Sequence, residues 1–136
     1  MDKKDLFYTA KDAINHSYAP YSNYNVGAAL LCKNGNVYNG CNVENASYSL
    51  TNCAERTALF TAIANSENEF EAICIVGGKN GVITDYAMPC GACRQVLSEF
   101  CVEDFKVYVG INENNIKKFK LSELIPYSFN KSKLGD

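Results

Sequence analysis

The sequence lacks the features of several protein classes. No apolar run is long enough to span a membrane, and none near the N-terminus has the length of a signal-peptide core. Basic residues are not in excess, since 13 Lys and Arg stand against 15 Asp and Glu for a formal net charge of -2. A polyanionic partner would favour a basic face instead. We therefore expect a cytoplasmic protein with no membrane partner and no nucleic-acid partner.

Internal repeats, low-complexity tracts and inter-domain linkers are also missing. The 136 residues suit one domain, and 47% hydrophobic with 21% charged residues is the balance of a globular protein. The last residues, Asn130–Asp136, are polar. We expect a single domain over residues 1–129 and a flexible C-terminal tail over residues 130–136.

Histidine is nearly absent, whereas cysteine is abundant. His16 is the one histidine, and there are seven cysteines. In a reducing compartment these cysteines should be thiols or metal ligands and not a disulfide framework. His16 lies within a predicted helix, where we expect a helix-surface or partly buried residue with no catalytic part.

Hydrophobic spacing predicts alternating helices and strands. Helices are expected over residues 5–18, 53–64, 91–101 and 122–124, and strands over residues 27–32, 36–42, 72–76, 105–111 and 117–121. Asn34–Gly35 predicts a tight turn, and Gly77–Gly78 is expected to end the third strand. A hairpin requires antiparallel pairing, whereas helical crossovers favour parallel pairing. This order predicts an α/β fold, a three-layer α/β/α sandwich with a mixed five-stranded sheet.

Two short cysteine motifs stand where a loop turns into a predicted helix. They are Cys53–Ala54–Glu55, with Thr51 or Asn52 as the expected N-cap, and Pro89–Cys90–Gly91–Ala92–Cys93. The positive end of a helix dipole favours the thiolate, which is the form that binds metal. Cys53, Cys90 and Cys93 could therefore hold one zinc ion and leave the fourth tetrahedral position open, as catalytic zinc sites do.

Charged residues beside Cys53 add to the catalytic interpretation. A carboxylate at Glu55 could serve as general base and then general acid next to the metal. Three thiolates and one Zn²⁺ sum to a negative charge, so a neighbouring cation should draw charge from the sulfurs. Arg56 is the first candidate for this second-shell cation, and Arg94 is a weaker one.

Simpler interpretations compete with this one. The pair Cys90 and Cys93 alone would fit a structural zinc or a redox pair equally well. A zinc-stabilised binding module would need a fourth protein ligand, for which no residue is suitably placed. Glu44 taken alone would be an ordinary loop carboxylate. The remaining cysteines are expected as small core residues, namely Cys32, Cys41, Cys74 and Cys101.

At these residues the sequence resembles the cytidine deaminases, specifically the small three-cysteine type that assembles as homotetramers. The resemblance runs from about residue 5 to about residue 129 and rests on the following stretches: Ala19–Ser22, Val26–Leu30, Gly40–Ala46, Cys53–Arg56 and Pro89–Gln95. It implies one zinc per subunit held by Cys53, Cys90 and Cys93, with Glu55 moving protons. The implied reaction is hydrolysis of free cytidine and deoxycytidine to uridine and deoxyuridine plus ammonia, in pyrimidine salvage.

The resemblance also implies the substrate contacts. Asn42 and Glu44 would bind the ribose hydroxyls, and the backbone of Ala54 would help to read the base. Tyr24 stands where the family usually has a phenylalanine that stacks near the pyrimidine. Phe129 would come from a neighbouring subunit, and Tyr48 could act across an interface.

Two points remain open at the level of the sequence. The stretch Asn80–Met88 is longer than the family's typical loop, and the resemblance assigns it no role. The same zinc chemistry would also suit a related nucleoside analogue or a base within a polynucleotide. The acidic charge and the absence of a basic arm weigh against the polynucleotide.

Overall fold

A single mixed sheet of five strands organises the computed structural model, which describes residues 1–135. The helices and strands are α1 (Lys3–Ala13), η1 (Ile14–His16), β1 (Tyr24–Cys32), β2 (Val37–Cys41), η2 (Tyr48–Leu50), α2 (Ala54–Ala64), β3 (Phe70–Lys79), α3 (Gly91–Phe100), β4 (Lys106–Asn112), β5 (Asn115–Lys120), α4 (Leu121–Leu124) and η3 (Lys131–Leu134). The strand order is β2-β1-β3-β4-β5. Strands β3 and β4 pair in parallel across the α3 crossover, and the other neighbours pair antiparallel. The predicted mixed sheet is confirmed.

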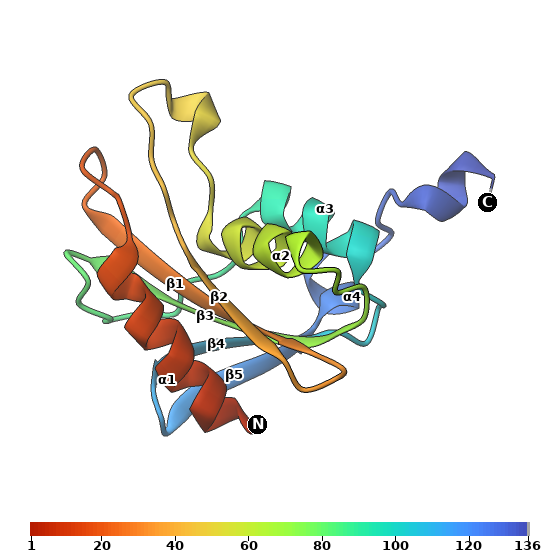
Figure 1. The fold of residues 1–136 in the computed structure, drawn as a ribbon, viewed down its shortest axis with the longest axis horizontal. Helices are drawn as coiled ribbons and strands as arrows, with labels where there is room; N and C mark the ends of the chain where they lie inside the picture. The colour runs from red at the N-terminus through yellow and green to blue at the C-terminus, as the bar shows by residue number, and fades with distance from the viewer. Residues whose placement is uncertain (136) are drawn as a thin grey trace.

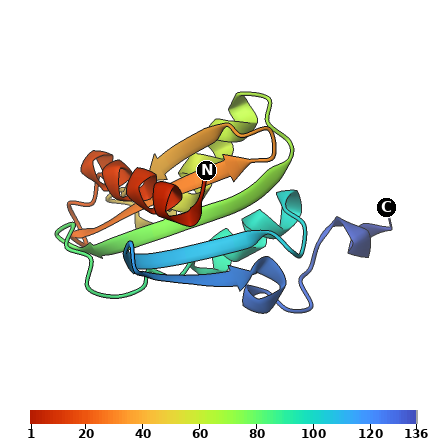
Figure 2. The same cartoon turned by 90° about the horizontal axis from the view of Figure 1, so that it is seen from below.

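Helices cover both faces of this sheet, with α1 on one face and α2 and α3 on the other (Figures 1 and 2). The alternation of β1 side chains follows from this arrangement. Ala28 and Leu30 join the core cluster under α2, whereas Ala29 and Leu31 join the cluster under α1. A strand covered on both faces has no polar side, which is why Gly27–Cys32 is apolar throughout. The predicted three-layer α/β/α sandwich is confirmed.

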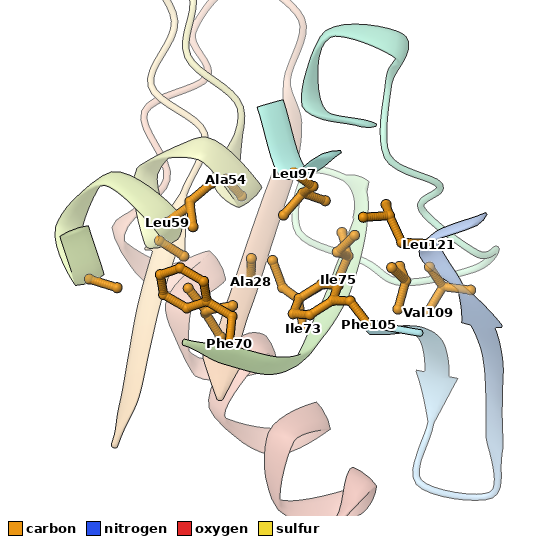
Figure 3. Close-up of a cluster of buried hydrophobic side chains, with 14 of the residues drawn as sticks. Ala28, Ala54, Leu59, Phe70, Ile73, Ile75, Leu97, Phe105, Val109 and Leu121 are labelled. Carbon is orange, nitrogen blue, oxygen red and sulfur yellow. The ribbon is translucent and has the colours of Figure 1, made fainter. Parts of the chain in front are cut away.

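The core beneath α2 and α3 fixes the two helices that carry the cysteine motifs. Leu59 of α2 and Leu97 of α3 reach down toward Ile73 and Ile75 of β3 (Figure 3). All four side chains are at most 1% exposed. Burying each of them contributes about 1.5–3 kcal/mol relative to leaving it in water. The position of both helix N-termini therefore depends on this apolar packing against β3.

Gly40 of β2 allows α2 to approach the sheet closely. A Cβ atom added at Gly40 would lie 2.6 Å from the carbonyl oxygen of Ala54, in the first turn of α2. Only a residue without a side chain permits this contact between two backbones. Gly27 of β1 likewise allows α1 to approach the other face of the sheet, where a Cβ would clash with the carbonyl oxygen of Ala10.

Several elements begin or end a few residues from their predicted bounds, and two of these differences have a clear physical reason. The first helix ends at Ala13 and continues only as the 3-10 turn η1, because Tyr18 forms an isolated bridge with Val43 and is extended. Strand β3 was expected to end at Gly77–Gly78, and this was wrong, since it continues to Lys79. The bare backbone of Gly78 leaves room for the carbonyl of Val82, which a side chain would displace.

The C-terminal segment leaves the body of the molecule after α4 (Figure 1). It forms the short turn η3 between Lys131 and Leu134. The flexibility of residues 130–136 stays a prediction, and Asp136 lies outside the described residues. Within residues 1–135, no helix is both long and apolar enough to cross a membrane.

Candidate active site and metal centre

The N-termini of α2 and α3 bring three thiols together. Cys53 precedes α2 in an extended conformation, Cys90 precedes α3, and Cys93 lies in the first turn of α3. The three sulfur atoms lie within 4.8 Å of one another, and the Sγ atoms of Cys53 and Cys90 are 3.8 Å apart. Within residues 1–135, no other His, Cys, Asp or Glu joins the group. The structure thus assembles the ligand set that the two motifs predicted.

The spacing of the sulfurs suits a zinc ion. Zinc binds thiolate at about 2.3 Å in tetrahedral geometry, which places two sulfurs about 3.8 Å apart. The distance between the Sγ atoms of Cys53 and Cys90 equals this value. Cys53 and Cys93 are half-buried and buried, whereas Cys90 is exposed, so one side of the cluster is accessible. Three thiolates with an accessible side fit a catalytic type of zinc site.

Hydrogen bonds favour a thiolate at Cys53 even without a metal. A hydrogen bond from the Cys93 thiol lowers the pKa of Cys53, and a second bond from the Arg56 guanidinium acts in the same direction. The Nη2 atom of Arg56 lies 3.4 Å from the sulfur. The pKa of Cys93 is raised in turn, because its proton is held in the bond to Cys53. Arg56 is therefore the cation beside the thiols.

The start of α2 departs from ordinary helix capping. Thr51 or Asn52 was expected as the N-cap, and this was wrong, since Cys53 occupies that position. Within residues 1–135 its side chain accepts no hydrogen bond from the helix backbone. Asn52 donates instead to the hydroxyl of Thr57 at 3.0 Å, and the hydroxyl of Thr51 accepts the N–H of Asn45 at 3.3 Å. The sulfur of Cys53 is left to face the other thiols.

Glu55 is the buried carboxyl group of the site. Its side chain is 4% exposed, although it lies in the first turn of α2. Burial raises the pKa of Glu55 to about 7, and the negative charge of Cys53 acts in the same direction. A carboxyl group with a pKa near neutrality can both accept and donate a proton at neutral pH. The burial of Glu55 excludes a solvent-facing helix carboxylate.

Glu55 opens into a cavity of about 220 Å³. The cavity is lined by Tyr24, Val26, Asn42, Thr51, Cys53, Ala54, Glu55, Ile75, Tyr86, Ala87, Met88 and Cys90. Among the predicted site residues, Tyr24, Asn42 and Ala54 are thus placed beside Glu55 and two of the ligands. A planar ring that entered here would meet the carboxyl group and the thiols together.

The loop before Cys90 supplies part of the wall, which the sequence did not indicate. Tyr86, Ala87 and Met88 line the cavity, and the ammonium group of Lys117 lies 4.5 Å from the centre of the Tyr86 ring. This cation–π contact connects the loop to β5. The available signal was position, because these residues directly precede the Pro89–Cys90 motif.

A second cavity of about 360 Å³ adjoins the first. It is lined by Tyr21, Ser22, Glu44, Tyr48 and Thr51, and Thr51 lines both cavities. Glu44 accepts hydrogen bonds from the backbone N–H groups of Tyr21 and Ser22 and from the Ser22 hydroxyl. The bond from Ser22 is the main reason that the pKa of Glu44 is lowered. Glu44 is therefore a fixed, charged acceptor beside the catalytic cavity.

The side chain of Asn42 is fixed by three hydrogen bonds, as that of Glu44 is. Its Oδ1 atom accepts from the Ser17 hydroxyl and from the backbone N–H of Val26, and its Nδ2 atom donates to the carbonyl oxygen of Tyr24 at 2.8 Å. Because a side-chain amide carries two N–H groups, the second one has no acceptor within residues 1–135, and Asn42 lines the cavity. Ser17 was not among the predicted site residues. Its contribution depends on a contact across 25 positions of sequence.

Tyr48, Phe129 and Arg94 are among the predicted residues that do not line the catalytic cavity. Tyr48 is 73% exposed, with its ring centre 5.9 Å from that of Tyr21. Phe129 is 62% exposed and lines neither of the two cavities of its own chain. Arg94 donates to the carbonyl oxygens of Pro89 and Leu124, so it connects α3 to α4 and is not the second cation at the thiols. A catalytic part for Tyr48 or Phe129 stays a prediction.

The other cysteines and the histidine lie where simple packing would put them. Cys32 and Cys74 are buried, and Cys41 and Cys101 are half-buried. His16 is exposed at the end of η1, away from the thiol cluster. None of these five residues lines the catalytic cavity.

Matches to known proteins agree with this arrangement. The family model described as "Cytidine and deoxycytidylate deaminase zinc-binding region" matches residues 1–110. A cytidine deaminase of Halalkalibacterium halodurans is 46% identical over 136 residues, which cover 100% of both chains. A cytidine deaminase of Sporosarcina psychrophila is 42% identical over 135 residues, or 99% of this chain and 96% of that protein.

The fold matches as closely as the sequence. The crystal structure of cytidine deaminase from Burkholderia pseudomallei superimposes with a TM-score of 0.86 at 45% identity, covering 95% of this chain and 100% of that chain. Sequence, fold and the three-thiol site with its buried carboxyl group point to the same family. The chain therefore belongs to the cytidine and deoxycytidylate deaminases, a family of hydrolytic enzymes.

Proposed function

We propose that this protein hydrolyses free cytidine and deoxycytidine to uridine and deoxyuridine, with release of ammonia, in cytoplasmic pyrimidine salvage. The observation that carries the proposal is the burial of Glu55 in one cavity with Cys53 and Cys90. A binding module would have no use for a buried carboxyl group whose pKa is raised to about 7.

Cys53, Cys90 and Cys93 would hold one zinc ion per subunit. Zinc bound by three protein ligands supplies a Lewis acid that makes water reactive at neutral pH. Arg56 acts through the sulfur of Cys53, because its hydrogen bond draws negative charge from that ligand. The geometry of the thiols and the bond from Arg56 support this assignment.

Glu55 moves the protons in the reaction. As a carboxylate it accepts a proton from the attacking water, and as a carboxylic acid it donates to N3 of the pyrimidine ring. Water adds at C4, and ammonia leaves from the same carbon, so cytidine and water give uridine and ammonia. A pKa near 7 lets the two forms of Glu55 interconvert at neutral pH.

The remaining cavity residues bind the nucleoside. Asn42 offers one N–H and Glu44 one acceptor position for the ribose hydroxyls, and the backbone of Ala54 contacts the base. Tyr24 provides an aromatic wall next to Glu55. The charge of Glu44 would repel a phosphate group, which favours free nucleosides over nucleotides.

We also propose that the enzyme acts as a homotetramer in which Phe129 completes the site of a neighbour and Tyr48 lies at an interface. Both aromatic side chains are mostly exposed in the single chain, at 62% and 73%. Diluting the enzyme while following sedimentation and specific activity tests this proposal. Activity should fall as the tetramer dissociates, and a fully active monomer would contradict it.

A substrate panel tests the function itself. Zinc-loaded enzyme is assayed for ammonia release from cytidine, deoxycytidine, cytidine 5′-phosphate, blasticidin S and single-stranded RNA. We expect turnover of the two free nucleosides only, with loss on chelation and recovery on adding Zn²⁺. If the enzyme turns over only blasticidin S, the nucleoside analogue of the panel, then that analogue and not cytidine is the substrate class. Salt-sensitive turnover of RNA would indicate an enzyme that acts on a polynucleotide. No turnover of any of them would favour the zinc-stabilised binding module.

A further inference from the structure

Ser22 uses every polar atom it has in the loop between η1 and β1. Its backbone N–H donates to Oε1 of Glu44 at 3.1 Å, and its hydroxyl donates to Oε2 of the same carboxylate. The hydroxyl oxygen also accepts the backbone N–H of Tyr24 at 3.0 Å. Its carbonyl oxygen accepts from the ammonium group of Lys79 at 2.9 Å. One serine therefore connects Glu44, the start of β1 and the end of β3.

The direction of the Ser22–Glu44 hydrogen bond follows from these partners. An ionised carboxylate can only accept, and the Ser22 oxygen already accepts the N–H of Tyr24. The hydroxyl proton of Ser22 must therefore point at Glu44. The loop that carries it is fixed as well, because Asn23 has a positive φ of 56° and its carbonyl accepts the N–H of Asn80.

The hydrogen-bonding capacity of Glu44 is then nearly filled. Oε1 accepts two backbone N–H groups, from Tyr21 and Ser22, whereas Oε2 accepts only the Ser22 hydroxyl. A carboxylate oxygen accepts about two hydrogen bonds. One acceptor position is left on Oε2, and Ser22 determines where it points. Only a ligand group that donates a hydrogen, such as a hydroxyl, can use it.

We infer that Ser22 is a positioning residue that, through Glu44, selects nucleosides carrying a sugar hydroxyl at the 2′ or 3′ carbon. The inference rests on the proposed function. Ser22 itself does not touch the reacting atoms, since it lines the second cavity and not the one that holds Glu55. Its effect should therefore appear in the binding of the sugar and leave the chemistry at the base alone.

Kinetics on three substrates isolate this role. Wild type, Ser22→Ala, Ser22→Thr and Ser22→Cys are compared on cytidine, deoxycytidine and 2′,3′-dideoxycytidine. Ser22→Ala should lose about tenfold in kcat/KM on cytidine, mostly through KM, as expected for one hydrogen bond to a charged group. The change on the dideoxy substrate, which has neither hydroxyl, should stay under about twofold. If deoxycytidine behaves as cytidine does, the selected hydroxyl is the 3′ one.

The other variants separate positioning from structure. Ser22→Thr keeps the donor and should restore most of the preference, whereas Ser22→Cys, a weak donor of similar shape, should lose it even if the alanine variant folds poorly. Ser98→Ala removes a half-buried serine that is far from Glu44 and donates only to the carbonyl oxygen of Gln95 within α3, and it should change nothing. An equal loss on all three substrates, or no loss on any, would overturn the inference. If wild type turns over no nucleoside, the proposed function fails first and the inference falls with it.

Discussion

The helices of this protein begin in two different ways. Helix α1 starts with an ordinary cap, in which the side chain of Asp2 accepts the backbone N–H of Asp5 at 2.9 Å. Helices α2 and α3 start with cysteines. The thiol of Cys53 accepts no hydrogen bond from the backbone of its own helix within residues 1–135, and the thiol of Cys90 accepts the backbone N–H of Cys93 at a long 3.4 Å. Side chains that usually stabilise a helix start are replaced by side chains that can bind metal.

The two faces of the sheet also differ, because one is packed only with groups that favour folding and the other buries a carboxyl group. The cluster under α1 consists of apolar side chains and the thiol of Cys74. On the other face, Glu55 is buried at the end of the apolar cluster, where burial disfavours its charged form. One face therefore holds apolar packing alone, whereas the other keeps an unfavourable buried carboxyl group that the proposed reaction would use. Local rules of folding are broken where the chemistry is.

Replacing Glu55 with glutamine is the sharpest test of this contrast. The variant keeps the shape of the side chain and removes its ability to carry protons, so kcat should fall about 10²–10⁴-fold. The zinc content and the thermal midpoint should stay close to those of wild type. Ammonia release from cytidine measures the loss.

Glu69→Gln is the matched control, because Glu69 is exposed and lies outside the catalytic cavity. It should retain full activity. Equal activity of wild type and Glu55→Gln would remove Glu55 from the mechanism. A Glu55→Gln protein that failed to fold would instead show that this face is not divided between stability and catalysis as described.

The glycines of the two faces give a second test. Gly27→Ala would force a Cβ against the carbonyl of Ala10 and should destabilise the protein by about 3 kcal/mol, as overpacking of a fitted contact does. Activity per folded molecule should not change, because α1 carries no site residue. Urea unfolding gives the first quantity, and active-site titration with a kinetic assay gives the second.

Gly40→Ala is the matched variant on the catalytic face. The added Cβ would press on the backbone of Ala54 and Ala58 and displace α2, which carries Glu55. Both stability and activity per folded molecule should fall. If Gly27→Ala lowers activity as much as Gly40→Ala does, the two faces are not independent.

Much of this site could be predicted from the sequence, for a physical reason. Cys53, Glu55, Cys90 and Cys93 lie in short motifs next to helix starts, so their spacing alone limits where they can point. Strands β1 and β3 followed from runs of apolar residues, which need cover on both faces. Local pattern was sufficient wherever the interacting residues are close in the sequence.

The features that were missed depend on contacts between distant segments. The extension of β3 through Gly77 and Gly78 depends on their pairing with Val26 and Asn25 of β1, about 50 positions earlier in the sequence. The bond between Ser22 and Glu44 spans 22 positions, and no periodic pattern encodes it. The choice of Cys53 over Asn52 as N-cap goes against the local preference and leaves the Cys53 sulfur in the cluster with Cys90 and Cys93.

Replacing each of the two arginines Arg56 and Arg94 should give smaller effects, on catalysis for Arg56 and on stability for Arg94. Arg56→Gln removes the hydrogen bond to the sulfur of Cys53 and should lower kcat about tenfold with zinc retained, as for one bond to a charged group. Arg94→Gln removes the bonds to the carbonyls of Pro89 and Leu124, so it should lower the thermal midpoint more than it lowers kcat. Kinetics, zinc analysis and thermal melts on both variants distinguish the roles. The reverse pattern would mean that the cation at the thiols is misassigned.

Removing the Asp2 cap of α1 should have the smallest effect on stability, and the pH dependence of that effect identifies the cap as its cause. The backbone N–H of Asp5 lowers the pKa of Asp2 from 3.8, so the folded state favours the ionised side chain. The stabilisation is therefore fully present above pH 3.8 and is lost as pH falls through the lower, folded pKa. Asp2→Ala should be slightly less stable than wild type at pH 7, and the difference should vanish in acid. Asp2→Asn keeps an acceptor that cannot titrate, so it should stay close to wild type at pH 7 and lose less stability on acidification. If Asp2→Ala matches wild type at every pH, α1 needs its cap no more than α2 does, and the contrast between the helix starts would rest on the cysteines alone.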